Sequence, residues 1–529
     1  MAHSDPDSNR GARGRGNTAG RWTTLTAVSI AAFMLLLDLS VVNVALPDIQ
    51  RELDAGFDDL RWVIDAYALG LAATMLITGS LGDRFGRRLI FTVGLGTFSV
   101  ASLLCAVAWS PLSLNLFRGL QGIGGAAMLA TSLALIAAAY SGRDRSVALA
   151  VWGAATAAAV ALGPMIGGAL VDGLSWEWIF LVNVPIGLIT AALVARGVRE
   201  SRDPEATGRP DVAGLLSLSS SMALLVIALF RGNEEGWGST LIVGMFAAAA
   251  VLLAAFVAIE RRVERPLLDL GLFRNPATIG ASVAILLTGV SVFALFTYLV
   301  LFLQNFLAYG AFDTGLRLLP LTVTIFFASA ATARLAERVP VRVVIVAGLA
   351  ISGVGLLLMR GVEVGSEWTA ILAGGALVGL GVGLLNPSVV AAALGAAPVR
   401  QSGMASGLNS TFRVLGTAIG VAALGAIMES EVSSSLTAAL GSAPSGLVDV
   451  VSTGNLGAAS AEAPAGLSDQ ASGASSVAFL DGLNSIFLAS AILILSAAAL
   501  SALLIREPDL AHATGVERDG VELPGEASG

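Results

Sequence analysis

Long apolar runs of roughly twenty residues alternate with short charged islands along most of this 529-residue chain. An α-helix rises about 1.5 Å per residue, so about twenty residues cross a hydrocarbon core about 30 Å thick. The pattern predicts an all-α polytopic membrane protein with fourteen spans. The expected spans are about Trp22–Leu46, Arg61–Ser80, Leu89–Trp109, Leu112–Ala139, Ser146–Val171, Trp178–Arg196, Val212–Phe230, Leu241–Ile259, Ala277–Leu307, Gly315–Ala333, Val341–Met359, Thr369–Val390, Gly403–Met428 and Phe479–Ile505.

A weak internal repeat organises these spans. The stretch Leu81–Arg88 after the second span and the stretch Leu335–Arg342 after the tenth share an acid, an Arg, a helix breaker and a second Arg. Chance similarity between two basic loops is the alternative. The repeat predicts two six-helix halves around a central cavity, as in transporters that rock between two states. The expected segments are a disordered tail (1–21), the first half (22–197), a linker with two inserted helices (198–276), the second half (277–505) and a C-terminal tail (506–529).

Arginine asymmetry predicts the orientation. If the N-terminus is inside, the tails and inner loops hold twenty-three Arg and the outer loops hold four. The positive-inside rule then places both termini in the cytoplasm. We expect the chain to lie in the inner (cytoplasmic) membrane of the cell. Residues 429–478 become an external loop, rich in Ser, Ala and Gly, which we expect to be flexible and mostly solvated.

Composition excludes several function classes. Only 13% of residues are charged, whereas a soluble domain carries about 25%. The chain has no Lys, so it holds neither a phosphate-binding P-loop nor a Schiff-base lysine. Its two His, His3 and His512, lie in the tails, and Cys105 is its one Cys. We therefore expect no intrachain disulfide, no His/Cys metal site and no cofactor.

One short charged stretch between two apolar runs carries the most information. Residues 79–90 read GSLGDRFGRRLI, with a helix-breaking Gly79, an acid and three Arg around Gly86. This stretch resembles the loop signature of the major facilitator superfamily. Further stretches resemble motifs of its fourteen-span drug:proton antiporters of the EmrB/QacA type, namely Leu37–Pro47, Arg118–Gly122, Gly163–Gly168, Trp176–Phe180 and Asn183–Gly187.

Two positions depart from the pattern of that family. Ala159 stands where the antiporter motif usually has a Gly, and Glu177 stands where the sixth span usually has an Arg. Ala is small enough to keep close helix packing, whereas Glu177 changes a charge at the extracellular rim. The resemblance nevertheless covers residues 22 to 505 and implies proton-coupled transport by the major facilitator fold.

Arg118 and Asp38 are the leading candidates for proton coupling. Burying an Arg within a span costs roughly 2.5–3.5 kcal/mol on insertion scales, so Arg118 should face the bundle interior, with Gln121 one turn further on the same face. The resemblance implies proton coupling for this Arg; a structural lock on backbone carbonyls is the alternative. Asp38 and Asn43 lie deep in the first span, where low dielectric disfavours an isolated carboxylate and a nearby Arg opposes that effect. A fixed helix-packing hydrogen bond is the alternative there.

Two more intramembrane charges are candidates for substrate or proton contact. Asp65 is flanked by Trp62 and Tyr67, and a carboxylate beside aromatic faces suits an organic cation. The alternative for Asp65 is an ordinary interface residue. Arg413 lies in a Gly-rich later span without an evident partner in the sequence.

Two sets of residues are expected to serve conformational change. A cytoplasmic latch should break when the halves rock, and the fifth span should kink where Gly and Pro remove side chains and one backbone donor. The latch candidates are Gly79, Asp83, Arg84, Gly86, Arg87, Arg88, Glu337 and Arg338, and the kink candidates are Gly163, Pro164, Gly167 and Gly168.

These observations favour an antiporter that exports hydrophobic or cationic drugs or antibiotics in exchange for protons. The expected partners are small-molecule substrates, protons and the lipid bilayer, with no nucleic acid and no obligate protein partner. A carrier of one specific metabolite, such as a self-made antibiotic, is the alternative within transport. A membrane enzyme lacks a catalytic constellation here, because no His lies in any span, and a receptor lacks a structured soluble domain.

Overall fold

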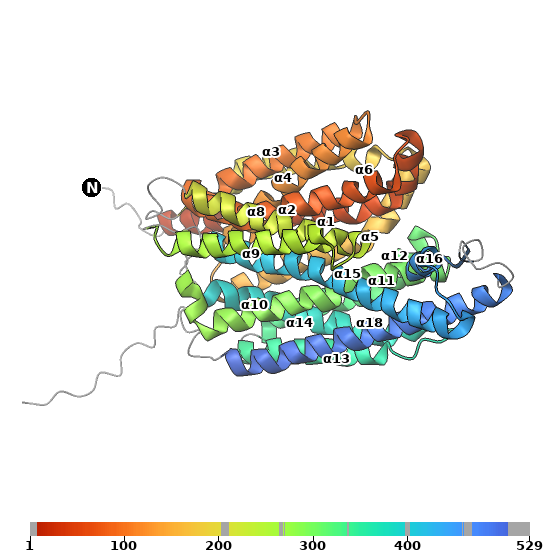
Figure 1. The fold of residues 1–529 in the computed structure, drawn as a ribbon. Helices are drawn as coiled ribbons and strands as arrows, with labels where there is room; N and C mark the ends of the chain where they lie inside the picture. The colour runs from red at the N-terminus through yellow and green to blue at the C-terminus, as the bar shows by residue number, and fades with distance from the viewer. Residues whose placement is uncertain are drawn as a thin grey trace, which may run out of the picture.

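Long helices that run side by side make up the structure, a computed structural model (Figure 1). It describes residues 8–202, 211–263, 268, 270–335, 338–396, 402–457, 459 and 468–505. Within these ranges there are helices and no strand. We call the end of the bundle where α1 begins and α18 ends the termini end, and the opposite end the distal end.

The helices of the first half pack around their own apolar core. Its main contacts are those of α2 and α3 with α4, and of α1 with α5 and α7. The helices are α1 (Ser8–Glu52), α2 (Phe57–Phe85), α3 (Arg87–Ala106), α4 (Pro111–Ala139), α5 (Gly142–Gly173), α6 (Trp178–Leu181) and α7 (Asn183–Gly197).

The second half has a separate core. Its first long helical stretch is interrupted by two π-helical segments, η2 and η3, which divide the expected ninth span. The elements are η1 (Leu270–Arg274), α10 (Pro276–Thr288), η2 (Gly289–Phe293), α11 (Ala294–Leu301), η3 (Phe302–Phe306), α12 (Ala311–Leu335), α13 (Val341–Leu358), η4 (Trp368–Ile371), α14 (Leu372–Ala396), α15 (Ser402–Leu440), α16 (Ser445–Ser452) and α18 (Ser468–Leu504).

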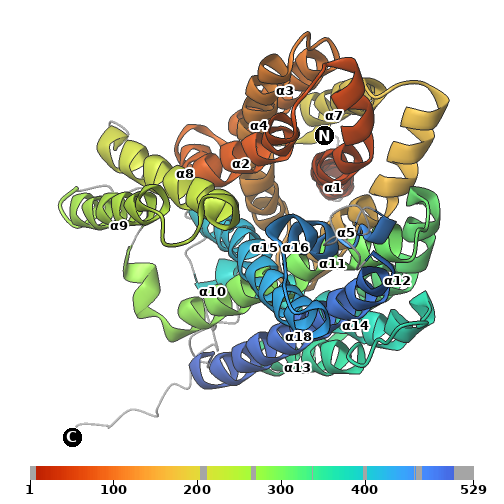
Figure 2. The same ribbon diagram turned by 45° about the vertical axis from the view of Figure 1, so that its right-hand side comes forward.

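Two helices, α8 (Val212–Glu235) and α9 (Thr240–Glu260), lie outside the two halves (Figure 2). The α8 helix packs against α2 of the first half and α15 of the second, and α9 packs mainly against α8. The halves meet directly where α12 and α14 contact α5, and where α15 contacts α2 and α4. The boundary between the halves is therefore formed mainly by α2, α4 and α5 on one side and α12, α14 and α15 on the other.

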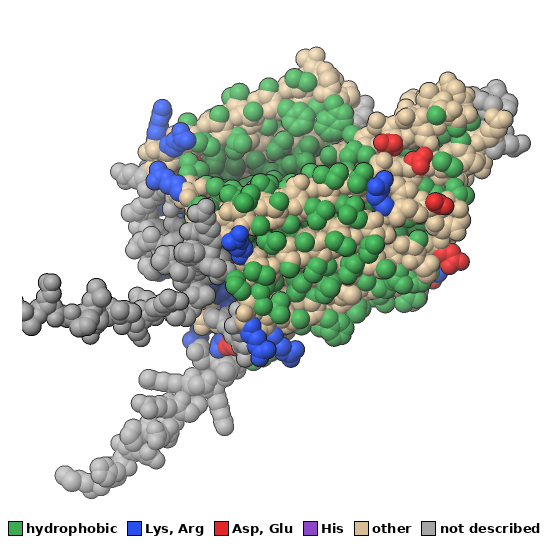
Figure 3. Space-filling view, turned by 90° about the horizontal axis from the view of Figure 1, so that it is seen from below, with side chains coloured by type: hydrophobic (Ala, Val, Ile, Leu, Met, Phe, Trp, Pro, Cys, Tyr) green, Lys and Arg blue, Asp and Glu red, His purple; other side chains and the backbone are tan. Residues whose placement is uncertain are grey.

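Membrane-spanning character is clear from length and surface. Among the described residues, thirteen helices are long and apolar enough to cross a bilayer, and they match thirteen of the expected spans. The remaining expected span lies on α5, which contains the apolar stretch Val147–Thr156. Figure 3 shows a broad apolar belt between two ends that carry the charged side chains. Such a belt is what a hydrocarbon environment requires of the outer surface.

The expectation that the N-terminal tail is disordered is wrong for part of its length. The α1 helix begins at Ser8, so the disorder expected over 1–21 does not hold for residues 8–21. Extending an existing helix adds hydrogen bonds without a new nucleation cost, which favours such extensions. Residues 1–7 and the expected tail over 506–529 lie outside the described ranges.

The segment 429–478 is also more ordered than expected. The α15 helix continues to Leu440 and α16 follows it, whereas residues 460–467 lie outside the described ranges. Val432 and Leu436 of α15, and Leu447 and Val451 of α16, are fully buried against the core of the second half. Each pair is four residues apart, which is the spacing of one helix face. This apolar periodicity is the signal that the Ser, Ala and Gly content obscured.

Candidate functional site

A buried polar network lies inside the first half, at its centre an ion pair between α1 and α4. Arg118 and Asp38 are almost completely buried. Arg118 Nη1 donates to Asp38 Oδ2 at 2.6 Å, and Gln121 Nε2 donates to Asp38 Oδ1 at 2.8 Å. Arg118 Nη1 also donates to Gln121 Oε1 at 2.7 Å. The structure thus joins Asp38 of α1 to Arg118 and Gln121, which the sequence had placed on one face of a single helix.

Other helices complete this network. Asn183 Nδ2 of α7 donates to Asp38 Oδ1 at 2.7 Å and to Ser102 Oγ of α3 at 2.9 Å. From α2, the Val63 carbonyl accepts from Arg118 Nε at 3.0 Å, and the Tyr67 ring lies 4.3 Å from the guanidinium carbon. Sequence reasoning assigned no role to Asn183 or Ser102, and it placed Tyr67 beside Asp65 rather than in this network. Only Asn183 carried a signal, because it opens the stretch Asn183–Gly187 that resembles a family motif.

The network suits an ionised Asp38. Every contact to its carboxylate comes from a donor, one of them a guanidinium, and charge-assisted hydrogen bonds of this kind are the strong ones. Two buried atoms, Arg118 Nη2 and Asn183 Oδ1, have no hydrogen-bond partner among the described residues. Adding a proton to Asp38 would remove the charge that holds Arg118. The pair can therefore act as a protonation-dependent contact between α1 and α4.

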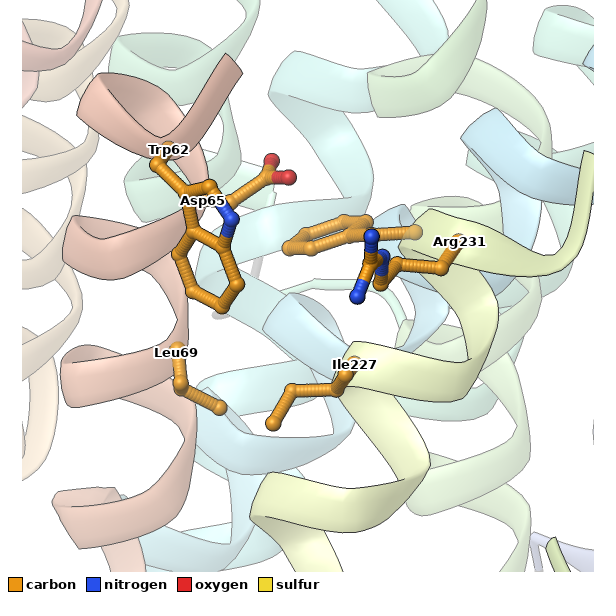
Figure 4. Close-up of a pocket in the computed structure, with 6 residues that line it drawn as sticks. Trp62, Asp65, Leu69, Ile227 and Arg231 are labelled. Atoms are coloured by element: carbon orange, nitrogen blue, oxygen red, sulfur yellow. The ribbon is translucent and has the colours of Figure 1, made fainter. Parts of the chain in front are cut away.

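Asp65 lies elsewhere. Figure 4 shows Trp62, Asp65 and Leu69 of α2 opposite Ile227 and Arg231 of α8, and these residues line one small pocket. The expectation that Tyr67 stands beside Asp65 as a second aromatic wall is wrong, because Tyr67 faces Arg118. Positions three or four apart share a helix face, whereas positions two apart do not.

Arg413 of α15 is also outside the network. It is half-buried at the boundary between the halves, and its guanidinium carbon lies 5.9 Å from the ring of Trp152 on α5. The side chain of Asn43, the remaining coupling candidate, lies outside the described part of the structure, although its backbone belongs to α1.

Asp83 and Arg87, two of the expected latch residues, take part in contacts at the termini end. Asp83 of α2 accepts from Arg87 Nε at 2.9 Å and, across the boundary between the halves, from the backbone nitrogen of Met404 in the first turn of α15 at 2.7 Å. Ser406 Oγ of α15 donates to the Ala130 carbonyl of α4 at 2.6 Å. A carboxylate at the start of a helix is favoured by the unpaired N–H groups and the positive end of the helix dipole.

Gly86 and Glu200 shape the same end. Gly86 separates α2 from α3 with φ at 121°, a conformation that favours glycine, and an added Cβ would lie 2.6 Å from the Glu200 carboxyl carbon. Glu200 accepts from the backbone nitrogens of Arg88 at 3.0 Å and Leu89 at 3.1 Å, so it caps α3. Glu200 was missed, since nothing local in the sequence links it to a helix start more than a hundred residues earlier.

The other latch candidates have mixed outcomes. Gly79 does not break α2, which continues to Phe85. It is buried, and a Cβ added at Gly407 of α15 would lie 3.5 Å from its Cα, so it serves close packing between the halves. Arg84 is half-buried beside the Phe85 ring. Arg338 is exposed in the turn after α12, and Glu337 lies outside the described residues.

The antiporter-motif residues lie where α5 meets α1. A Cβ at Gly163 would overlap the Ser40 hydroxyl, and one at Gly167 would lie 3.1 Å from Val41 Cγ1. Gly168 is half-buried on the same helix. The α5 helix is continuous through Pro164, whose side chain is not among those described, and a kink there stays a prediction. The motif therefore permits close approach of two helices. Within the described ranges, no group of three or more His, Cys, Asp or Glu is placed to hold a metal ion.

Comparison with known proteins places the chain among transporters. It is 37% identical over 414 residues to "Multidrug resistance protein Stp" of Mycobacterium tuberculosis, covering 78% of this chain and 77% of that one. It is 33% identical over 413 residues to "Tetracenomycin C resistance and export protein" of Streptomyces glaucescens, covering 78% and 76%. The structure of the human organic anion transporter MFSD10 superposes with a TM-score of 0.59 at 16% identity, covering 91% and 99%, and supports the fold. The profile of the Major Facilitator Superfamily matches residues 28–420. This chain folds as a helical bundle of two halves and shows this similarity over most of its length. It therefore belongs to the major facilitator superfamily of membrane transporters.

Proposed function

We propose that this chain is a proton-coupled antiporter of the fourteen-span EmrB/QacA type that exports hydrophobic drugs or antibiotics from the cell. The names of two relatives, a multidrug resistance protein and an antibiotic export protein, support drug efflux. The single observation that carries proton coupling is the enclosed Asp38–Arg118 pair, joined at 2.6 Å. Transport of this kind involves no covalent chemistry, and a small molecule and protons are the partners it needs.

Coupling follows from the dependence of that pair on one proton. Protonating Asp38 abolishes its attraction for Arg118, and among the described residues Arg118 then keeps the Val63 carbonyl, Gln121 and the Tyr67 and Phe180 rings. An Arg without a counter-ion in the apolar bundle is costly. The protonated state therefore favours a rearrangement of α4 relative to α1 that gives Arg118 new partners. Release of the proton from Asp38 to the other side of the membrane restores the pair and completes the cycle.

The latch would hold the transporter closed at its cytoplasmic end in one of the two states of this cycle. With both termini in the cytoplasm, the contacts of Asp83 with Arg87 and Met404 close the cytoplasmic end. Opening that end requires the N-terminal turn of α15 to leave the carboxylate. The two halves then rock about the boundary where α5 meets α12 and α14. Within the first half, the small residues Gly163 and Gly167 let α5 stay in close contact with α1.

The membrane potential supplies enough energy without ATP. One charge moving through about 100 mV is worth about 2.3 kcal/mol. At about 1.4 kcal/mol per tenfold, one proton sustains a gradient of roughly fifty-fold for a neutral substrate.

The test is transport by purified protein in sealed vesicles under an imposed pH gradient, with a broad panel of antibiotics and dyes. We expect several chemically unrelated compounds to accumulate against their gradient and an uncoupler to abolish this. The variants Asp38→Asn and Arg118→Gln should insert normally and transport nothing. Full proton-driven transport by either variant contradicts the assigned coupling role. Movement of one compound alone supports the second candidate, a narrow exporter, which the name of the tetracenomycin C protein favours.

A further inference from the structure

Arg413 and Trp152 face one another across the boundary between the two halves. Arg413 belongs to α15 and Trp152 to α5, and the guanidinium carbon lies 5.9 Å from the indole ring. Each residue is ten or eleven positions from the start of its helix at the termini end, which at about 1.5 Å per residue is about 15 Å along the bundle. The contact therefore lies near the middle of the membrane.

Arg413 differs from Arg118 and Arg317, two other arginines that lie within expected spans. Arg118 pairs with Asp38 at 2.6 Å and Arg317 pairs with Asp313 at 2.9 Å. Among the described residues, no ion pair or hydrogen bond involves the Arg413 guanidinium, and its one cation–π contact is with the Trp152 ring. A cation at this depth is costly, and one ring at the outer limit of a cation–π contact offsets only part of that cost.

Further donors at this place also lack an acceptor. The Trp152 side chain is buried, and its Nε1 has no hydrogen-bond partner among the described residues. Ser410 lies three residues before Arg413, on the same face of α15, and its fully buried hydroxyl has no partner among the described residues either. Within the described ranges, the Arg413 guanidinium beside the Trp152 ring, the indole N–H and a hydroxyl on the same face of α15 thus have no acceptor. What the site lacks is an oxygen-rich, negatively charged group.

We propose that Arg413, Trp152 and Ser410 form a substrate subsite that binds an acidic group, a carboxylate or phenolate, of the exported compound. This subsite rests on the proposed efflux function and names the substrate class that it takes. The Arg413 fork donates to the anionic oxygens, and the indole face packs on the apolar body of the substrate.

The charge balance along the boundary supports an anion over a cation. The Asp38 carboxylate is already neutralised by Arg118 inside the first half. Asp65 lines the pocket between α2 and α8, rather than the boundary where α5 meets the second half. In the part of the chain that the structure describes, Arg413 thus carries a positive charge on that boundary with no paired acid. The subsite therefore predicts an acidic group on the substrate, whereas Asp65 alone suggested cationic compounds.

The subsite also offers a route for release. Its donors come from both halves, Trp152 from the first and Arg413 and Ser410 from the second. When the halves rock, α5 and α15 change their separation and the donors no longer converge on one oxygen pair. Affinity for the acidic group then falls in the state that must let the substrate go.

The experiment compares two dyes that differ only by one methyl group on a carboxyl. Rhodamine 110 has the free carboxylate, and rhodamine 123 is its methyl ester. Binding of each dye to the purified full-length protein is measured by fluorescence anisotropy, and proton-driven uptake is measured in vesicles. The variants are Arg413→Gln, which removes the charge, and Arg413→Lys, which keeps it. Arg317→Gln is the matched control, because it removes an arginine paired with Asp313 away from the subsite.

We expect the unaltered protein and Arg317→Gln to bind the free acid at least about tenfold more tightly than the ester, which corresponds to about 1.4 kcal/mol. Arg413→Gln should abolish this preference while binding the ester unchanged, and Arg413→Lys should retain part of it. Equal binding of the two dyes, an acid preference that survives in Arg413→Gln, or no binding of the acid would each overturn the subsite.

The two proposals fail in different ways. Proton-driven uptake of the ester with no acid preference contradicts the subsite and leaves efflux intact. Arg413-dependent binding of the acid with no uptake of any compound contradicts efflux and leaves the anion subsite standing.

Discussion

The Asp83 carboxylate lies 2.7 Å from the backbone nitrogen of Met404, so a side chain of the first half caps the first helical turn of α15 in the second. The same carboxylate pairs with Arg87 one turn further along the chain, at 2.8 Å. One residue thereby links the loop after α2 to the opposite half. This relationship makes Asp83 the residue whose loss should loosen the termini end most directly.

Replacing Asp83 with Asn should open the termini end. The amide keeps the shape and loses the charge, and a hydrogen bond to a charged group contributes about 1.5–3 kcal/mol. In a Cys105→Ala background with Ala405→Cys on α15, we expect Asp83→Asn to raise the maleimide labelling rate about tenfold. The control is Asp144→Asn, which removes an exposed carboxylate paired with Arg21 within the first half. Equal labelling of both variants would show that the Met404 contact does not hold this end closed.

Breaking the central pair should destabilise the protein more than removing it entirely. Arg118→Met leaves the Asp38 charge buried without a counter-ion, which costs about 3–5 kcal/mol. Adding Asp38→Asn should restore part of this stability, because no unpaired charge remains. The measurement is a double-mutant cycle on the free energy of unfolding in detergent. For Arg21 and Asp144, an exposed pair, the same cycle should give an interaction of about 0–1 kcal/mol.

The contact of α5 with α1 should depend on the absence of a side chain at Gly163. Gly163→Ala places a Cβ on the Ser40 hydroxyl, and overpacking of this kind costs about 1–3 kcal/mol. Ser40→Gly should rescue it, since both clashing atoms of Ser40 are then absent. Gly153→Ala on the same helix meets no atom within 4 Å and should be neutral or stabilise by about 0.5–1 kcal/mol. Thermal unfolding of Gly163→Ala, of Gly163→Ala combined with Ser40→Gly, and of Gly153→Ala checks this; a Gly163→Ala protein as stable as Gly153→Ala contradicts it.

Glu200 should hold the start of α3. Glu200→Ala removes the acceptor of two backbone N–H groups, those of Arg88 and Leu89, and loss of such a cap costs about 1 kcal/mol. Amide hydrogen exchange at residues 88–91 should accelerate about fivefold. Glu235→Ala, which removes an acid paired with Arg231 on α8, should leave that exchange unchanged. Unaltered protection in Glu200→Ala would mean that the helix start is held by other contacts.

Hydropathy alone located the spans because each helix of a membrane protein must satisfy its backbone within itself. Each element then carries its own signature of length and apolarity, and thirteen of the expected helices were recovered in this way. The same locality explains the errors. The extension of α1 to Ser8 and the packing of α16 depend on weak or short apolar patterns. The polar and small-residue composition of these segments predicted disorder instead.

The types of side chain in the sequence showed which buried residues need hydrogen-bond or ion-pair partners. Only the tertiary structure decided which residues those partners are. An Arg in an apolar run must find acceptors, so Arg118 was identifiable from its position alone. Its pairing with Asp38, eighty residues away, and the contribution of Asn183 follow from how α1, α4 and α7 pack. Asp65 and Tyr67 were neighbours in the sequence, yet helix geometry points them at different elements. Apolar burial is non-directional and can be read along the chain, whereas hydrogen bonds and ion pairs are directional and short, and exist only once helices from distant parts of the chain have met.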